Sequence, residues 1–115
     1  MAYDYHLADR IARLLKEKKV SFYEKKMFGG LCYMVDDKMC LGIVKDNLMG
    51  RIGEAAYPEA MKRAGCKEMD FSGRPMKGYV FVEPEGIDLD TDLEHWVQLC
   101  LDFNPKAKAS KKRNK

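Results

Sequence analysis

Few side chains in this chain could do acid–base or nucleophilic chemistry, and they form no recognisable catalytic motif. The two histidines, His6 and His95, each lie among helical residues but off the apolar stripe, which is typical of solvated helix side chains. No serine lies in a Gly-x-Ser-x-Gly nucleophile elbow: Ser21, Ser72 and Ser110. Neither a Walker phosphate loop nor a Gly-x-Gly-x-x-Gly motif is present. We therefore predict a protein that is not an enzyme and needs no cofactor.

The sulfur-bearing side chains offer a second kind of chemistry. The chain has eight methionines and four cysteines, the latter being Cys32, Cys40, Cys66 and Cys100. They contain no Cys-x-x-Cys pair, and their alternation with Leu, Ile and Val favours core filling over a soft-metal site for Cu(I). We expect no metal, and reduced, buried thiols in a cytoplasmic protein. Two sharper alternatives are a Cys32–Cys40 disulfide and a nucleophilic Cys66 with a lowered pKa.

A group of cationic side chains is the third candidate for a functional site. The segment Asp70–Gly78 is the most distinctive in the chain, because it combines two glycines, a proline and two cations, Arg74 and Lys77. Loops with such special backbone residues often carry function. With Lys25 and Lys26 these cations could form a small patch for an acidic partner or a phosphate backbone. The alternative is that Arg74 and Lys77 pair with acids of the same domain.

The charge is unevenly divided along the chain. Lysines and arginines exceed acids by 21 − 18 = +3 overall, but residues 106–115 hold six cations and no acid, so residues 1–105 carry 15 − 18 = −3. We expect one slightly acidic domain over 1–105 and a disordered basic tail over 106–115. The tail could follow phosphates without reading bases, or simply aid solubility. Its cations are Lys106, Lys108, Lys111, Lys112, Arg113 and Lys115.

The first half of the chain reads as a helix followed by hairpins. Apolar residues at helical spacing predict a helix over residues 4–18 with Asp4 as its N-cap. Short apolar runs between Phe22 and Ile52, separated by two or three turn residues, predict antiparallel strands. The runs after the Gly29-Gly30 pair cover 31–35, 39–44 and 48–52.

In the predicted hairpin over 31–44, alternation assigns each side chain to a face. One face holds Leu31, Tyr33, Val35, Met39, Leu41 and Ile43. The other holds Cys32, Met34, Cys40, Gly42 and Val44. Neither face is polar, so we expect one to pack against helices and the other to be covered by a second subunit. A homodimer is therefore one expectation.

The second half predicts two more helices and one clear strand. A helix is expected over about 54–64, with Pro58 tolerated in its first turn and Gly65 as its C-cap. Residues 66–75 read as irregular and 79–82 as a strand. The last helix should start near Thr91, where Thr91 and Glu94 match a capping box, and should end at Asn104-Pro105.

These elements predict an α+β domain. Their order is helix, strands, helix, strands, helix, with helices packed on an antiparallel sheet of about five strands. No apolar run approaches the roughly 20 residues of a membrane span. The first ten residues lack a cationic start leading into an apolar stretch. A soluble, cytoplasmic protein without a membrane partner is expected.

An ordered series of motifs resembles a known family. These are Lys25-Lys26-Met27-Phe28-Gly29-Gly30-Leu31, Met39-Cys40-x-Gly42, Asp46-x-Leu48-Met49-x-Arg51-x-Gly53 and Met69-Asp70-Phe71-Ser72-Gly73-Arg74-Pro75-Met76-Lys77-Gly78. From about Tyr3 to Phe103 the chain is similar to the TfoX N-terminal domain family (TfoX/Sxy). The resemblance implies helices around an antiparallel sheet, in a topology like that of secretion-chaperone domains.

The resemblance also implies a kind of function. Name-giving members are bacterial regulators of competence for DNA uptake that act as transcription coactivators, and they carry a further C-terminal helical domain where this chain has the basic tail. We expect a non-enzymatic regulatory domain with a protein partner, such as transcription machinery. The alternatives are weak nucleic-acid binding and a small-ligand or minor enzymatic role. The motif residues are candidates for the contact surface: Lys25, Lys26, Met27, Phe28, Gly29, Gly30, Arg51, Arg74, Pro75, Met76 and Lys77.

Overall fold

The structure is a computed structural model that describes residues 4–27, 30–71 and 74–106. Its helices are α1 (Tyr5–Glu17), α2 (Tyr57–Ala60) and α3 (Asp90–Phe103), with short 3-10 turns η1 (Pro84–Gly86) and η2 (Asn104–Lys106). Its strands are β1 (Tyr23–Met27), β2 (Gly30–Val35), β3 (Lys38–Val44), β4 (Asn47–Arg51), β5 (Cys66–Phe71) and β6 (Arg74–Val82).

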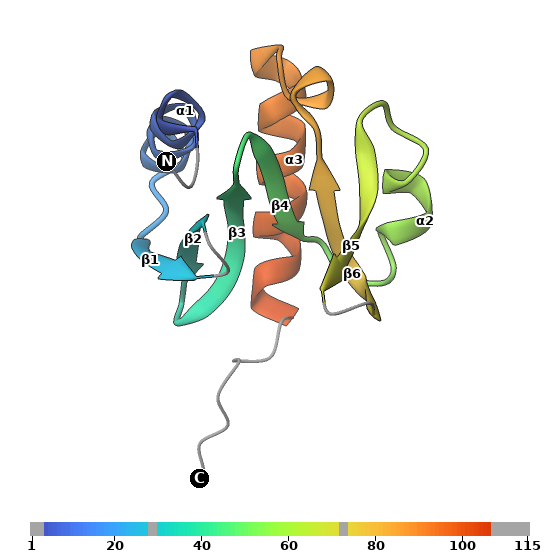
Figure 1. The fold of residues 1–115 in the computed structure, drawn as a ribbon. Coiled ribbons are helices and arrows are strands. Elements are labelled where there is room, and N and C mark those ends of the chain that lie inside the picture. The colour runs from blue at the N-terminus through green and yellow to red at the C-terminus, as the bar shows by residue number, and fades with distance from the viewer. Residues whose placement is uncertain (1–3, 28–29, 72–73, 107–115) are drawn as a thin grey trace, which may run out of the picture.

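The six strands form one antiparallel sheet in the order β1-β2-β3-β4-β6-β5. Strands β1 to β4 follow one another as hairpins, and β5 and β6 form a hairpin whose second strand pairs with β4. Helices α1 and α3 pack on the same face (Figure 1). The predicted α+β class and element order are confirmed, with six strands rather than about five.

Helix α1 forms as its sequence predicts. The Asp4 carboxylate accepts hydrogen bonds from the backbone N–H groups of His6 (2.9 Å) and Leu7 (3.2 Å), which satisfies donors that the first turn leaves unpaired. Three residues of the apolar stripe are buried against the sheet and α3: Leu7, Ile11 and Leu15.

The predicted capping box of α3 does not form. The helix begins at Asp90, and its N-cap Leu89 makes no side-chain cap. The Glu94 carboxylate, which the box would turn back toward Thr91, instead accepts a hydrogen bond from Lys18 Nζ of α1 at 3.1 Å. A contact with the end of α1 has replaced a local one, while the apolar side of α3 buries Leu93 and Trp96.

The second helix is much shorter than predicted. Only Tyr57–Ala60 is α-helical, although Pro58 does fall in the first turn. After the helix, the backbone N–H groups of Lys62 and Arg63 donate hydrogen bonds to carbonyls only three residues earlier, as in a 3-10 turn. Ala60 is the only buried residue of this helix, so little packing sustains it.

The prediction of an irregular connection over residues 66–75 is also wrong. The described residues of this segment belong to β5 and to the start of β6. Strand β5 is an edge strand whose Lys67 and Glu68 are exposed, so it lacks the apolar alternation that marks a half-buried strand. Gly78, expected before the strand, lies inside β6 with φ +89°.

A register shift corrects the predicted faces of the β2–β3 hairpin. The pairing slips between Tyr33 and Met34, so that Met39 lies opposite Met34. Met39 therefore joins the face of Met34, while Cys40 packs in the core beneath the helices. Strict alternation fails here because a β-bulge inserts one residue.

The two faces of the sheet have different cores. The helix-side core joins residues of α1, α3 and the strands, among them Trp96 and Tyr33. The other core, which we call the sulfur face, consists of Cys32, Met34, Met39 and Met49, with Val44, Tyr79 and Phe81 packed around it. Its four sulfur-bearing residues are at most 6% exposed within one chain. Their burial therefore does not require the second subunit that the apolar pattern suggested.

The search for membrane spans gave a negative result for the described ranges. No helix there combines the length and the apolar character needed to cross a membrane.

Candidate functional site

The four cysteines are free and buried, so the Cys32–Cys40 disulfide is absent. Burial raises the pKa of the Cys66 thiol to about 11, and the nearby Arg63 offsets this only in part. Burial likewise raises the pKa of Cys32 to about 11 and that of Cys40 to about 12. A nucleophilic cysteine needs a lowered pKa, so these thiols stay protonated near neutral pH. The hypothesis of a reactive Cys66 thereby loses its chemical basis.

The histidines lie on different helices. His6 is exposed in the first turn of α1. His95 is partly buried on α3, edge-on to the Trp96 ring at 5.7 Å. Burial and the Arg63 charge lower the pKa of His95, and Asp92 acts against them. Among the residues that the structure describes, no three His, Cys, Asp or Glu side chains gather to hold a metal ion.

The sheet separates the cations that the sequence grouped. Lys25 and Lys26 are exposed on the edge strand β1 and, as neighbours in a strand, point to opposite faces. Arg74 and Lys77 belong to β6, and their side chains lie outside the described residues. β1 and β6 are four strand positions apart, or about 19 Å at the usual spacing of about 4.8 Å. Lys25 and Lys26 therefore lie on a strand far across the sheet from the strand that holds Arg74 and Lys77.

Arg51 has an internal role. It ends β4, and its guanidinium carbon lies 5.6 Å from the ring centre of Tyr79 and 5.9 Å from that of Phe103. Two steps on, Gly53 has φ +88°, and a Cβ there would come within 2.5 Å of the Phe103 ring. The Gly78 carbonyl accepts hydrogen bonds from Ile52 N (2.8 Å) and Gly53 N (3.0 Å). This part of the motif therefore joins β4, β6 and the end of α3.

The structure describes only some of the remaining candidate residues, and for several of these it describes the backbone alone. Met27 lies in β1, and Pro75 and Met76 lie in β6, all without described side chains. Gly30 pairs with Met27, and a Cβ on Gly30 would collide with the Ile43 carbonyl. Lys106 is exposed in η2. The others lie outside the described residues: Phe28, Gly29, Lys108, Lys111, Lys112, Arg113 and Lys115.

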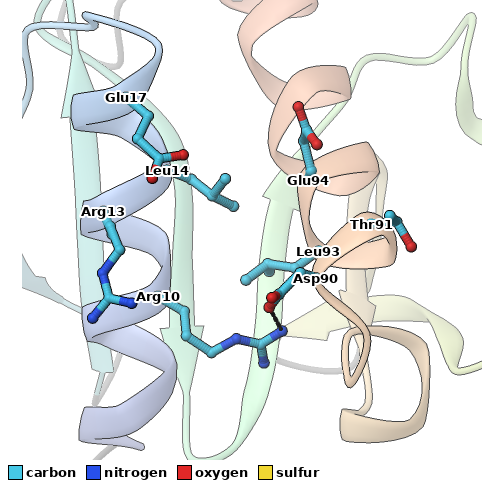
Figure 2. A pocket seen from close by; sticks show the side chains of 8 residues that line it. All are labelled: Arg10, Arg13, Leu14, Glu17, Asp90, Thr91, Leu93 and Glu94. Carbon is cyan, nitrogen blue, oxygen red and sulfur yellow. Dashed lines mark hydrogen bonds and ion pairs between the residues drawn. The ribbon is translucent and has the colours of Figure 1, made fainter.

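A groove that no sequence motif predicts lies between α1 and α3 (Figure 2). This α1–α3 groove has a volume of about 300 Å³. It is lined by Arg10, Arg13, Leu14, Glu17, Asp90, Thr91, Leu93 and Glu94. Figure 2 shows Leu14 and Leu93 pointing toward each other from the two helices. Because the two leucines belong to different helices, only the packing of α1 beside α3 brings them together.

Two polar ties join the helices along this groove. Arg10 Nη2 donates to Asp90 Oδ1 at 3.1 Å and to the Asp88 carbonyl at 3.2 Å. Lys18 Nζ donates to Glu94 Oε2 at 3.1 Å and to Gln98 Oε1 at 2.9 Å. Leu14 lies midway between Arg10 and Lys18 in sequence, so the apolar part of the groove lies between the ties.

A second groove, of about 410 Å³, lies between α2 and α3. Its cations already have partners: Lys62 pairs with Glu59 at 3.5 Å, and Arg63 with Asp92 at 3.7 Å. Arg63 also lies over the Trp96 ring, 5.8 Å from its centre. This groove thus offers no unpaired charge to attract a small ionic ligand.

Comparison with known proteins adds one finding. The family model described as the TfoX N-terminal domain matches residues 15–104. This stretch begins in the last turn of α1 and runs through the end of α3. A search of curated proteins and a search of solved structures found no match. The matched stretch contains all six strands of the sheet and covers most of the chain, and on that basis the chain belongs to the TfoX N-terminal domain family.

Proposed function

We propose that this chain is a regulatory domain that acts by binding another protein and catalyses no reaction. The family match over residues 15–104 carries the proposal, because name-giving members of that family are regulators of competence. The chemistry of the site supports it. The thiols are buried and protonated, and the two histidines lie on separate helices.

Such a partner would need apolar area that remains exposed on this chain. The sulfur face is already buried within the chain, so its side chains offer little apolar area to another protein. The large apolar side chains that remain exposed are Tyr5, Tyr23 and Leu89, among the residues described. Leu89 directly precedes Asp90, which lines the α1–α3 groove. The side of the sheet covered by α1 and α3 is therefore the better docking region.

The proposal is tested by reconstitution. The full chain is cross-linked in lysate of the cells that produce it, captured proteins are identified, and each candidate is purified and titrated against the chain. We expect one protein to form a stoichiometric complex that survives nuclease treatment and moderate salt. Capture that disappears with nuclease, and no complex between purified proteins, would overturn the proposal.

A second candidate function is weak nucleic-acid binding, which the division of charge favours. Six cations fall in residues 106–115, and the preceding residues carry a net −3. The test is duplex DNA binding by the full chain and by a chain ending at Pro105, at low and moderate salt. If the tail alone binds, truncation abolishes binding, and log K falls with log salt with a slope of about −5 at most. Sequence-specific binding by both chains would place recognition in the folded domain instead.

A further inference from the structure

We propose that the α1–α3 groove binds a short, basic, amphipathic helix of a partner protein. The inference rests on the proposed function and names the class of partner. The groove has two features of helix-in-groove recognition, an apolar lining and charged rims. Leu14, which is partly exposed, supplies the accessible apolar lining above the buried Leu93 (1% exposed), and the rims belong to two separate helices.

The length of the groove suits two anchoring side chains. Its ties fall at Arg10 and Lys18, eight residues apart on α1, or about 12 Å along the helix axis. Residues three or four apart on a docked helix are about 5–6 Å apart. Two neighbouring apolar side chains of a partner helix therefore fit between the ties, over Leu14 and Leu93.

The charges favour a basic occupant. Arg10, Arg13 and Lys18 already have carboxylate partners: Asp90, Asp9 and Glu94 respectively. Asp90 keeps 95% of its side chain exposed despite its tie. Glu17 lines the groove and makes no ion pair with any described residue. The rim can thus accept further cations more readily than further anions.

The segment that leads into α3 also favours a basic partner. Residues 83–94 carry six acids and no lysine or arginine, and they lead into the α3 rim. Leu89, within this stretch, is 62% exposed and directly precedes Asp90. An exposed leucine surrounded by carboxylates complements an apolar face flanked by lysines or arginines.

A second copy of this chain fits the groove less well. Its basic amphipathic helix is α1, which carries Arg10, Arg13, Lys16 and, at its end, Lys18. The apolar stripe of α1 is already buried in its own domain: Leu7, Ile11 and Leu15. It is therefore not free to enter another groove.

The test uses an 18-residue synthetic helix with leucines on one face and lysines on the other. Its binding to the full chain is measured by fluorescence anisotropy at moderate salt, beside a matched peptide with glutamates in place of lysines. We expect the basic peptide to bind and the acidic one not to. NMR amide shifts should move along residues 10–18 and 89–94.

Charge reversal locates the site. Glu17→Lys, at a position with no ion pair to lose, should weaken binding of the basic peptide about three- to tenfold. Glu24→Lys makes the same change at an exposed position on β1 and should leave binding unchanged. Equal binding to both variants, or no binding of the basic peptide, would overturn the proposal.

Two further outcomes separate this inference from the proposed function. If an identified partner binds the Glu17→Lys chain as tightly as the unmodified chain, the protein-binding function stands and the groove proposal falls. If the chain alone sediments as a dimer that Glu17→Lys dissociates, the groove holds a second copy, which also refutes the proposal.

Discussion

The two faces of the sheet are buried by different means. On one face, α1 and α3 cover strand residues and seal them from water around Trp96. On the other, the described residues of the core all belong to strands, and the sulfur face packs among strand side chains. Leu48 and Met49 show the contrast most directly, because these neighbours on β4 point to opposite faces and are both 0% exposed.

The difference lies in the side chains as well as in the cover. The helix-side core is built largely of branched and aromatic residues, which have few rotamers and fix their neighbours. Three of the four residues of the sulfur face are methionines, whose flexible side chains fill irregular gaps. We infer that the helix side fixes the fold more strictly and that the sulfur face tolerates change better.

The largest expected effect is at the centre of the helix side. Trp96→Ala should lower the free energy of unfolding by about 3–5 kcal/mol, because it leaves a large cavity beneath α3. Unfolding in urea is followed by far-UV circular dichroism, since the chain has only one tryptophan. Trp96→Phe, which keeps a ring, should cost less. Equal loss in both variants would show that ring size does not set the stability of this core.

The neighbouring pair on β4 compares the faces directly. Leu48→Ala should cost about 3–4 kcal/mol and Met49→Ala about 2 kcal/mol, within the usual range for such truncations. The reason is that Met34 and Met39 can rearrange into the space that Met49 leaves. Both variants are measured by urea denaturation under identical conditions. A greater loss for Met49→Ala would mean that the sulfur face is the more rigid core.

Gly42 offers a test of how tightly the sulfur face is packed. A Cβ there would lie 2.6 Å from the Leu31 carbonyl oxygen and 2.8 Å from Met49 Cε. Gly42→Ala should cost about 1–3 kcal/mol through overpacking. The Gly42→Ala, Met49→Ala double variant should lose less unfolding free energy than the two single variants lose together, because the contact with the methionine is already gone. Strict additivity would show that backbone crowding alone sets the cost.

The last comparison concerns pH. Burial raises the pKa of Cys32 to about 11 and of Cys40 to about 12, against about 8.5 for an unfolded thiol. The folded state then holds protons that the unfolded state releases, so this stability is complete below about pH 8.5 and declines as pH rises toward the folded pKa. The urea midpoint should therefore fall between pH 8.5 and 10.5. The fall should be shallower in Cys32→Ala and in Cys40→Ala than in the unmodified chain, and an unchanged slope in both variants would contradict the burial of these thiols.

Local signals predicted several elements well. Asp4 begins α1 as an N-cap, and the apolar stripes of α1 and α3 reach the core as their spacing indicates. Strands β2, β3 and β4 begin and end within one residue of the strands predicted over 31–35, 39–44 and 48–52. In each case the residues that determine the structure are close in sequence, so a single chain segment contains the whole signal.

Predictions failed where a distant partner decides the structure. Glu94 contacts Lys18 rather than closing a capping box, and the bulge opposite Tyr33 moves Met39 and Cys40 to opposite faces from those expected. The candidate surface shows the same limit. Arg51 lies between Tyr79 and Phe103, which come from elements later in the chain.

The sequence by itself determined the fold class, the starting point of α1, the unequal charge of residues 1–105 and 106–115, and the family. Only the tertiary structure decided that the sulfur face is buried within one chain, that Lys25 and Arg74 lie on strands far apart in the sheet, and that Leu14 and Leu93 line one groove. The physical reason is that periodicity shows which side chains avoid water. The element that covers them is fixed by strand order and helix packing, which join residues as far apart as Arg10 and Asp90.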